Sequence, residues 1–233
     1  MRVGDEAGPG DQGHEPGHPG SRRPDGPPRL AAGHDRPDLA APAPPRLPLS
    51  RRRSPVVTLT LVRHGRPLVD PALPPSAWEL DPAAFDEVWA LRDVLSPRSS
   101  PRASSRAFWA CSPERKAVET AQLLTDGDVG VLPSLVEQRG RTWLPEGLDA
   151  AVADALARPS VPARPGWEPV ADLRARLVAT VDALRAEHPG RDLVLVGHGL
   201  AWTVLEAAVR GTEPTPGEWR AWGFPDVHSL PLP

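Results

Sequence analysis

Short apolar runs alternate with longer amphipathic segments along the chain from about residue 56 onward. The runs are short and mostly rich in β-branched residues, as in strands that a parallel sheet buries on both faces. The predicted strands are residues 56–62 (VVTLTLV), 108–111 (FWAC), 192–196 (DLVLV) and a last short one near 227–232. Strands that alternate with helices predict an α/β fold, a three-layer sandwich in which helices cover both faces of a mostly parallel sheet.

Helix signals fill the segments between these strands. In residues 169–187 the apolar side chains recur at helical spacing, which predicts a face that packs on the sheet. Asp81 and Ser112 each stand directly before a proline, an order typical of a helix start. The predicted helices are residues 81–95, 112–124, 148–157, 169–187 and 200–209, with a long connection at 126–147.

Residues 1–54 differ in composition from the rest of the chain. They are rich in Pro, Gly and Arg, and they contain none of the eight Trp or three Phe. A segment without large apolar side chains cannot offset the entropy cost of ordering its backbone. The sequence therefore predicts a disordered tail over 1–54 and one domain over 55–233. The functional alternative is a basic tail that binds an acidic partner through Arg51, Arg52 and Arg53.

Composition and charge exclude several classes of function. A net charge of −3 does not favour a nucleic-acid partner. The single cysteine, Cys111, excludes a disulfide framework and a multi-cysteine metal site, and it fits a reducing, cytoplasmic setting. No stretch approaches the ~18 apolar residues of a membrane helix, and the first residues lack the apolar core of a secretory signal. The sequence does not indicate an oligomeric state.

Two predicted strands end directly in a histidine that is followed by glycine. His64–Gly65 closes the first strand and His198–Gly199 closes a later one. In open α/β sheets the ligand site lies outside the carboxyl ends of the strands, so both histidines are expected at the same edge. Glycine after each histidine lets the backbone approach a ligand closely. The alternative is that these are two unrelated loop histidines.

Four segments in order resemble the motifs of the histidine phosphatase superfamily, which includes phosphoglycerate mutases and many small phosphatases. The first, LVRHG, resembles the family signature, and CSPERKAVETA resembles the family's Ser-x-x-x-Arg-Ala-x-x-Thr-Ala helix. LVE resembles the segment that carries an acid/base carboxylate, and VGHG resembles the second-histidine motif. The four segments are residues 61–65, 111–121, 135–137 and 196–199.

The resemblance implies a role for each of five residues. His64 would attack phosphorus and form a phosphohistidine, and Glu137 would protonate the leaving alcohol and then deprotonate water. Arg63, Lys116 and His198 would bind the phosphate oxygens. No metal or organic cofactor is implied, and the expected partner is a small-molecule phosphate ester. The implied function is phosphomonoester hydrolysis on a small metabolite. A phosphoglycerate-type mutase and a non-catalytic phospho-ligand-binding module are the alternatives.

The sequence departs from the family pattern at three places. Lys116, the only lysine, stands where the family has an arginine, and it would keep the charge but lose bidentate geometry. Arg115 lies ~100° around the helix from it and is expected to face solvent. Asp70 stands where many members have an asparagine, and its carboxylate would repel phosphate unless it is turned away or paired, for example with Arg66.

The identity of the acid/base residue and the wall of a substrate pocket stay open. The residues after Glu137 do not reproduce the family's usual continuation, so Glu146 is the reserve candidate. Several tryptophans are candidates for the pocket or for the core, and the segment 222–226 is expected near the site. These tryptophans are Trp143, Trp167, Trp202, Trp219 and Trp222.

Overall fold

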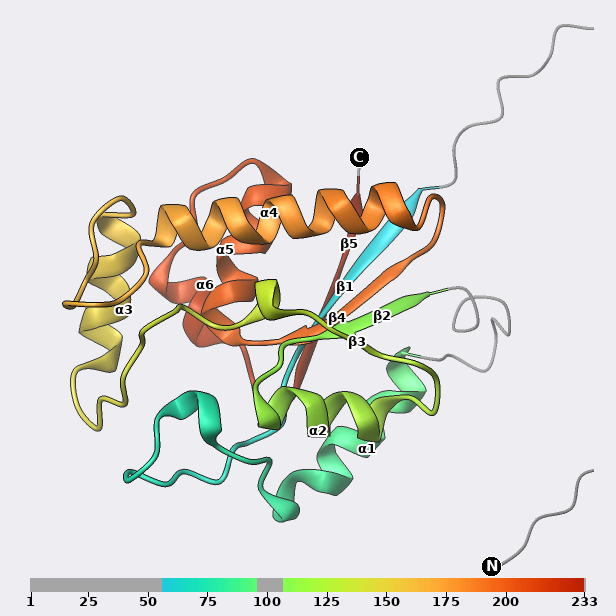
Figure 1. The fold of residues 1–233 in the computed structure, drawn as a ribbon, viewed down its shortest axis with the longest axis horizontal. Coiled ribbons are helices and arrows are strands. Elements are labelled where there is room, and N and C mark those ends of the chain that lie inside the picture. The colour runs from blue at the N-terminus through green and yellow to red at the C-terminus, as the bar shows by residue number, and fades with distance from the viewer. Residues whose placement is uncertain (1–55, 96–106, 233) are drawn as a thin grey trace, which may run out of the picture. The chain divides into compact units, whose positions relative to one another are not determined.

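The computed structural model describes residues 56–95 and 107–232 (Figure 1). The predicted tail over 1–54 and the arginines at 51–53 lie outside the described residues. No helix in the described ranges is long and apolar enough to cross a membrane.

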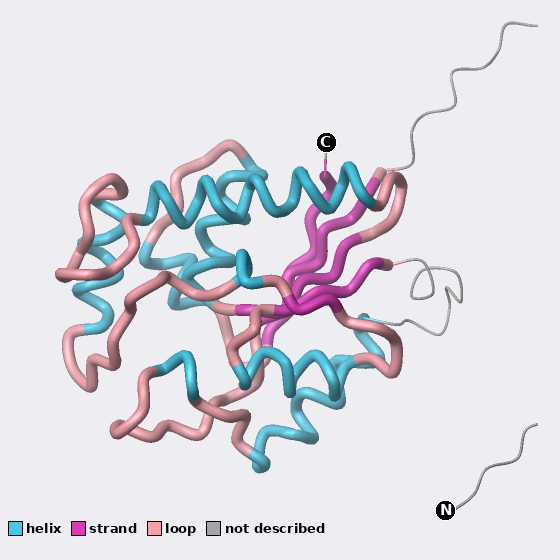
Figure 2. The backbone as a smooth tube through the Cα atoms, viewed as in Figure 1, coloured by secondary structure: helices cyan, strands magenta, loops and turns pink. Residues whose placement is uncertain are grey.

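A sheet of five strands forms the centre of the described domain (Figure 2). The strands are β1 (Val57–Arg63), β2 (Phe108–Cys111), β3 (Gly130–Val131), β4 (Leu193–Gly197) and β5 (Asp226–Leu232). They lie in the order β3-β2-β4-β1-β5. The first four pair in parallel, and β5 pairs antiparallel with β1. The prediction of a mostly parallel sheet is therefore confirmed.

Helices cover both faces of this sheet, as the sequence predicts (Figure 1). Helices α1 (Phe85–Leu95) and α2 (Arg115–Leu124) pack on one face. The other face carries α4 (Val170–Glu187) and α5 (Gly199–Arg210), flanked by α3 (Leu148–Ala157) and α6 (Pro216–Ala221). The three-layer α/β fold is confirmed.

The side-chain alternation of a strand explains the two layers of core. In β4, Leu193 and Leu195 join the cluster under α4 and α5, whereas Val194 and Val196 join the cluster under α1 and α2. Both sets are buried, because successive side chains of a strand point to opposite faces. A strand that is covered on both faces has to be apolar throughout, which is why β4 reads as one continuous apolar run.

The observed elements differ from the predicted ones mainly at helix starts and at short strands and helices. The predicted helix from Asp81 begins as a 3-10 turn (Pro82–Ala84), capped by the Asp81 carboxylate, before α1 starts. Ser112 does not cap α2, which begins three residues later, at Arg115. Strand β3 lies inside the predicted connection, and α6 was not predicted although Thr215 forms a capping box there. Two further 3-10 turns are Pro75–Ala77 and Pro133–Leu135.

Candidate active site

The carboxyl ends of β1 and β4 bring the two histidines together. The strands are neighbours in register, with Arg63 opposite Gly197, and the backbone N–H of His64 donates to the Gly197 carbonyl at 2.9 Å. The imidazole rings of His64 and His198 lie with centroids 5.2 Å apart, edge to face. The prediction that both histidines share one sheet edge is confirmed, and the reading as two unrelated loop histidines is wrong.

The hydrogen bond of His64 fixes which ring nitrogen carries the proton. Nδ1 lies 2.7 Å from the carbonyl oxygen of Gly65, and a carbonyl can only accept, so Nδ1 is the protonated nitrogen. Burial lowers the pKa of His64 well below its ordinary value of 6.5, and the neighbouring His198 and Lys116 lower it further. At neutral pH the ring is therefore neutral, and Nε2 has a free lone pair.

Arg63 lines the cavity with a guanidinium that is held from several sides. Its Nη1 donates to the Trp222 carbonyl at 2.6 Å, and its Cζ lies 3.4 Å from the centroid of the Phe224 ring. A Cβ added at Gly199 would lie 3.0 Å from that Cζ. Burial is the main reason that the pKa of Arg63 falls to about 10, which still leaves it charged. Its Nε is buried without a hydrogen-bond partner in the described structure.

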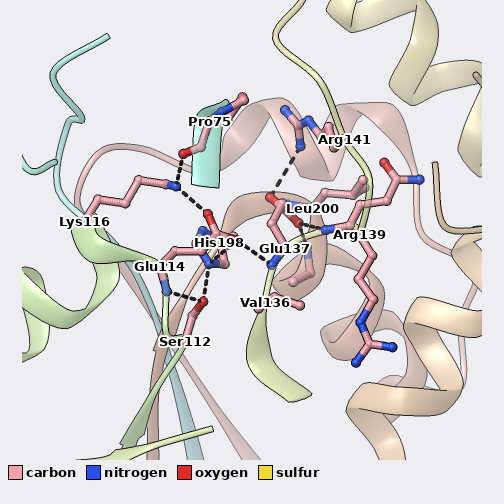
Figure 3. A network of polar contacts seen from close by, with 12 residues as sticks. Pro75, Ser112, Glu114, Lys116, Val136, Glu137, Arg139, Arg141, His198 and Leu200 are labelled. Carbon is pink, nitrogen blue, oxygen red and sulfur yellow. Dashed lines mark hydrogen bonds and ion pairs between the residues drawn. The ribbon is translucent and has the colours of Figure 1, made fainter. Parts of the chain in front are cut away.

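His198 is buried, and its ring is held by polar contacts on one side (Figure 3). Its Nε2 lies 2.8 Å from the Ser112 hydroxyl and 3.3 Å from a carboxylate oxygen of Glu114. Burial lowers the pKa of His198, and although Glu114 opposes this shift, Lys116 adds to it. The ring is therefore neutral at neutral pH. Ser112, which sequence reasoning treated as a helix cap, contacts this histidine instead.

Lys116 is buried, with only 4% of its surface exposed, and is therefore not an ordinary surface lysine of a helix. Its Nζ lies 2.5 Å from the carboxylate of Glu114 and donates to the Pro75 carbonyl at 2.6 Å (Figure 3). The neighbouring Arg115 is half exposed and pairs with Glu79 and Glu119, so its predicted solvent-facing position is confirmed.

Glu114 is a buried residue of the site that sequence reasoning missed. One oxygen of its buried carboxylate contacts Lys116, while the other accepts from the backbone N–H of Glu137 at 2.9 Å and approaches His198. Burial acts to raise the pKa of Glu114, but its interactions with His198 and Lys116 outweigh burial, so the pKa is lowered. Because His198 is itself neutral at neutral pH, Lys116 is the main partner of the carboxylate charge. The sequence feature that could have revealed Glu114 is its place two residues before the only lysine.

The Glu137 side chain contacts the N-terminal end of α5 and lines the same cavity as the histidines. Its carboxylate accepts from the backbone N–H groups of Ala201 at 3.0 Å and Leu200 at 3.4 Å, and it lies 3.4 Å from Nη1 of Arg141 (Figure 3). Glu146, the reserve candidate, is exposed and does not line the cavity. The geometry therefore brings Glu137 to the site and leaves Glu146 outside it.

The carboxylate of Asp70, in the loop after His64, does not line the cavity. Asp70 is exposed, and its side chain accepts from the backbone N–H of Ala72 at 2.9 Å. Arg66, one candidate partner of Asp70, lies instead 3.5 Å from Asp81 and 3.6 Å from Glu87. Asp70 therefore adds no negative charge to the cavity.

One cavity of about 620 Å³ contacts all five residues that the sequence singled out: Arg63, His64, Lys116, Glu137 and His198. Phe224 also lines it, with its ring centroid 5.3 Å from that of His64, so segment 222–226 does approach the site. In the described ranges no group of three His, Cys, Asp or Glu side chains is arranged to hold a metal ion.

Of the five candidate tryptophans, three line the cavity, and two of these three, Trp219 and Trp222, also belong to the buried core cluster. Trp143, Trp219 and Trp222 line the cavity. Trp167 and Trp202 are buried in the core cluster, where the indole N–H of Trp202 donates to the Val62 carbonyl at 2.8 Å. The cavity gains a further aromatic side chain from Trp78, which sequence reasoning did not single out.

Comparison with solved structures supports the same fold. A mycobacterial glucosyl-3-phosphoglycerate phosphatase is 24% identical with a TM-score of 0.56, over 72% of this chain and 85% of its own. Bacillus stearothermophilus YhfR is 22% identical with a TM-score of 0.56, over 70% and 84%. A phosphoserine phosphatase mutant from Entamoeba histolytica, solved with phosphoserine, is 16% identical with a TM-score of 0.58, over 74% and 89%. At these identities the likeness establishes the fold alone.

The sequence comparisons establish the family. No curated protein sequence matches the chain significantly. The profile of the histidine phosphatase superfamily (branch 1) matches residues 59–230, a span that includes both His-Gly strand ends and the whole described cavity wall. The chain therefore belongs to the histidine phosphatase superfamily.

Proposed function

We propose that the domain at 55–233 is a phosphomonoester hydrolase that works through a phosphohistidine on His64 and acts on a small phosphorylated metabolite. The observation that carries the proposal is the protonation of His64: Nδ1 is tied to the Gly65 carbonyl, and Nε2 is the free nucleophilic nitrogen of a neutral ring in the cavity. The buried, free cysteine fits a reducing, cytoplasmic setting.

In the first half-reaction, Nε2 of His64 forms a bond to phosphorus as the bond from phosphorus to the ester oxygen breaks. Glu137 gives its proton to the departing alkoxide, so that a neutral alcohol leaves. Arg63, Lys116 and His198 bind the non-bridging oxygens, and the unpartnered Nε of Arg63 is a donor that a phosphate oxygen would satisfy. The Lys116 and His198 contacts become available when Glu114 yields to the phosphate.

In the second half-reaction, Glu137 takes a proton from a water molecule, and the water oxygen attacks phosphorus. The bond from phosphorus to Nε2 breaks, inorganic phosphate leaves, and His64 returns to its neutral state. Each of these steps uses only side chains of the chain and water.

The test is hydrolysis of an aryl phosphate by the purified protein with EDTA present, beside His64→Ala. Turnover that survives EDTA and is lost in His64→Ala is the expected result. Equal turnover in both proteins would contradict the assignment of His64. A dependence of the activity on a bisphosphorylated activator would instead indicate the mutase alternative.

A second candidate is a module that binds a phosphorylated ligand without turning it over. Two observations favour it: the Glu137 carboxylate is already engaged by the α5 N-terminus and Arg141, and Glu114 already contacts Lys116 and His198. A folded wild-type protein that binds orthovanadate but shows no turnover would support this candidate.

A further inference from the structure

The cavity is much larger than a phosphoryl group requires. Its volume of about 620 Å³ falls within the range of about 300–1,000 Å³ for pockets that hold drug-sized ligands. The proposed phosphate ligands Arg63, Lys116 and His198 are only part of its lining. Most of the remaining space is therefore available to the organic part of the substrate.

Aromatic side chains from three separate segments line the cavity, and Phe224 lies at its His64 end, with ring centroids 5.3 Å apart. Trp78 follows β1, Trp143 lies in the connection before α3, and Trp219, Trp222 and Phe224 lie in α6 and the loop after it. The Trp78 and Trp143 rings pack edge to face with centroids 4.8 Å apart, and the Trp78 indole N–H donates to the Asp70 carbonyl at 2.8 Å. Aromatic rings fixed in this way form a rigid apolar surface that loses little entropy on binding.

The cations beside this aromatic wall already have carboxylate partners. Apart from the proposed phosphate ligands, the described cavity lining contains three arginines, and each lies within 4 Å of a carboxylate. The pairs are Arg66 with Asp81 and Glu87, Arg141 with Glu137, and Arg220 with Asp149. A second anionic group on the substrate would have to compete with a carboxylate at each of these positions.

We propose that the substrate is a phosphomonoester whose organic part is large, uncharged and apolar or aromatic, and that the five aromatic side chains bind that part. This inference rests on the proposed hydrolase function and names its substrate class. The phosphoryl group lies at the His64 end, and the organic group extends along the wall formed by Trp78, Trp143 and the residues of α6 and the following loop. A short substrate with a carboxylate beside its phosphate would make no contact with this wall, and its carboxylate would find no arginine without a carboxylate partner.

The experiment compares three phosphate esters of primary alcohols: propyl phosphate, 3-(2-naphthyl)propyl phosphate and O-phosphoserine. We expect kcat/KM of the naphthylpropyl ester to exceed that of propyl phosphate by about 30-fold, which corresponds to about 2 kcal/mol. We expect phosphoserine to be no better than propyl phosphate. A naphthylpropyl preference below about threefold, or a preference for phosphoserine, would overturn the proposal.

Variants test whether the aromatic wall is responsible. Trp143→Ala is expected to reduce the naphthylpropyl-to-propyl ratio of kcat/KM by about tenfold. The matched control is Trp89→Ala: Trp89 is a half-exposed tryptophan of α1 that does not line the cavity, and its removal should leave the ratio unchanged. If Trp143→Ala leaves the ratio at its wild-type value, the wall does not bind the organic group and the proposal is wrong.

Binding measurements separate this inference from the proposed function. If no ester is turned over, the hydrolase proposal fails, and the affinities of propylphosphonate and 3-(2-naphthyl)propylphosphonate still decide the inference. Isothermal titration calorimetry reports that binding directly, and it avoids the overlap between naphthyl and tryptophan fluorescence. A naphthyl phosphonate that binds at least about tenfold more tightly supports the aromatic wall. Equal affinities contradict it, whatever the catalytic result.

Discussion

Gly199→Ala is expected to lower activity while it leaves the fold intact. An added Cβ would lie 3.0 Å from Cζ, 3.1 Å from Nε and 3.3 Å from Nη2 of Arg63. Carbon atoms in good contact lie about 3.5–4.0 Å apart, so the guanidinium would have to withdraw by about 0.5 Å or more. Cζ also lies 3.4 Å from the centroid of the Phe224 ring, and Nη1 donates to the Trp222 carbonyl at 2.6 Å. A withdrawal of the guanidinium would disturb both of these contacts.

The magnitude follows from the precision that a phosphate ligand requires. A misplacement of about 1 Å can cost about 100-fold in rate, so a shift of half that size is expected to lower kcat/KM about 10- to 100-fold. That loss corresponds to about 1.4–2.8 kcal/mol of transition-state stabilisation. Two effects on stability oppose each other. The close contact with Arg63 destabilises the folded state, whereas alanine favours a helix over glycine by about 0.5–1 kcal/mol. The free energy of unfolding should therefore change by less than about 1 kcal/mol.

The assay pairs kcat/KM on an aryl phosphate with urea denaturation of the same preparation. Gly217→Ala is the matched control, since a Cβ added at this exposed glycine of α6 would lie 3.8 Å from the Thr215 hydroxyl oxygen, an ordinary contact distance. It should retain activity and gain slightly in stability. Full activity of Gly199→Ala would show that the position of the Arg63 guanidinium does not limit catalysis, and would refute the reasoning.

Three further predictions concern the buried ionisable side chains of the site. Glu114→Gln removes the negative charge beside Lys116 and should lower the inhibition constant of inorganic phosphate about tenfold; an unchanged constant would mean that Glu114 does not compete with phosphate. Lys116→Met should lower the free energy of unfolding by about 3 kcal/mol in urea denaturation, because Glu114 stays buried without its cation. Adding Glu114→Leu should restore most of that loss, and an equal loss in both variants would contradict the pairing. The pKa values of His64 and His198 are lowered by folding, so below about pH 6.5 the unfolded chain binds more protons and the stability they contribute is lost as pH falls. Denaturation midpoints at about pH 7.5 and 5.5 should show this decrease, and His64→Gln should make it smaller.

Much of the fold could be predicted from local patterns. Strand β4 is apolar at every position because both of its faces are covered, and α4 repeats apolar residues on one face because only that face packs. The shortest elements could not be predicted in this way. Strand β3 has two residues and forms only because β2 presents a free edge beside it, a condition that no periodicity in the local sequence reveals.

The sequence alone determined which residues would meet at the sheet edge. Each histidine follows a buried strand, and parallel neighbours end at the same side, so the meeting of His64 and His198 follows from chain order and strand direction. The tertiary structure decided which other charges face them. Glu114 and Glu137 are 23 residues apart and meet only because the connection after α2 returns to this edge, while Glu146 on the same connection points to solvent. Such contacts depend on how loops cross the end of the sheet, and loop paths are set by packing between distant segments rather than by the propensities of the residues within them.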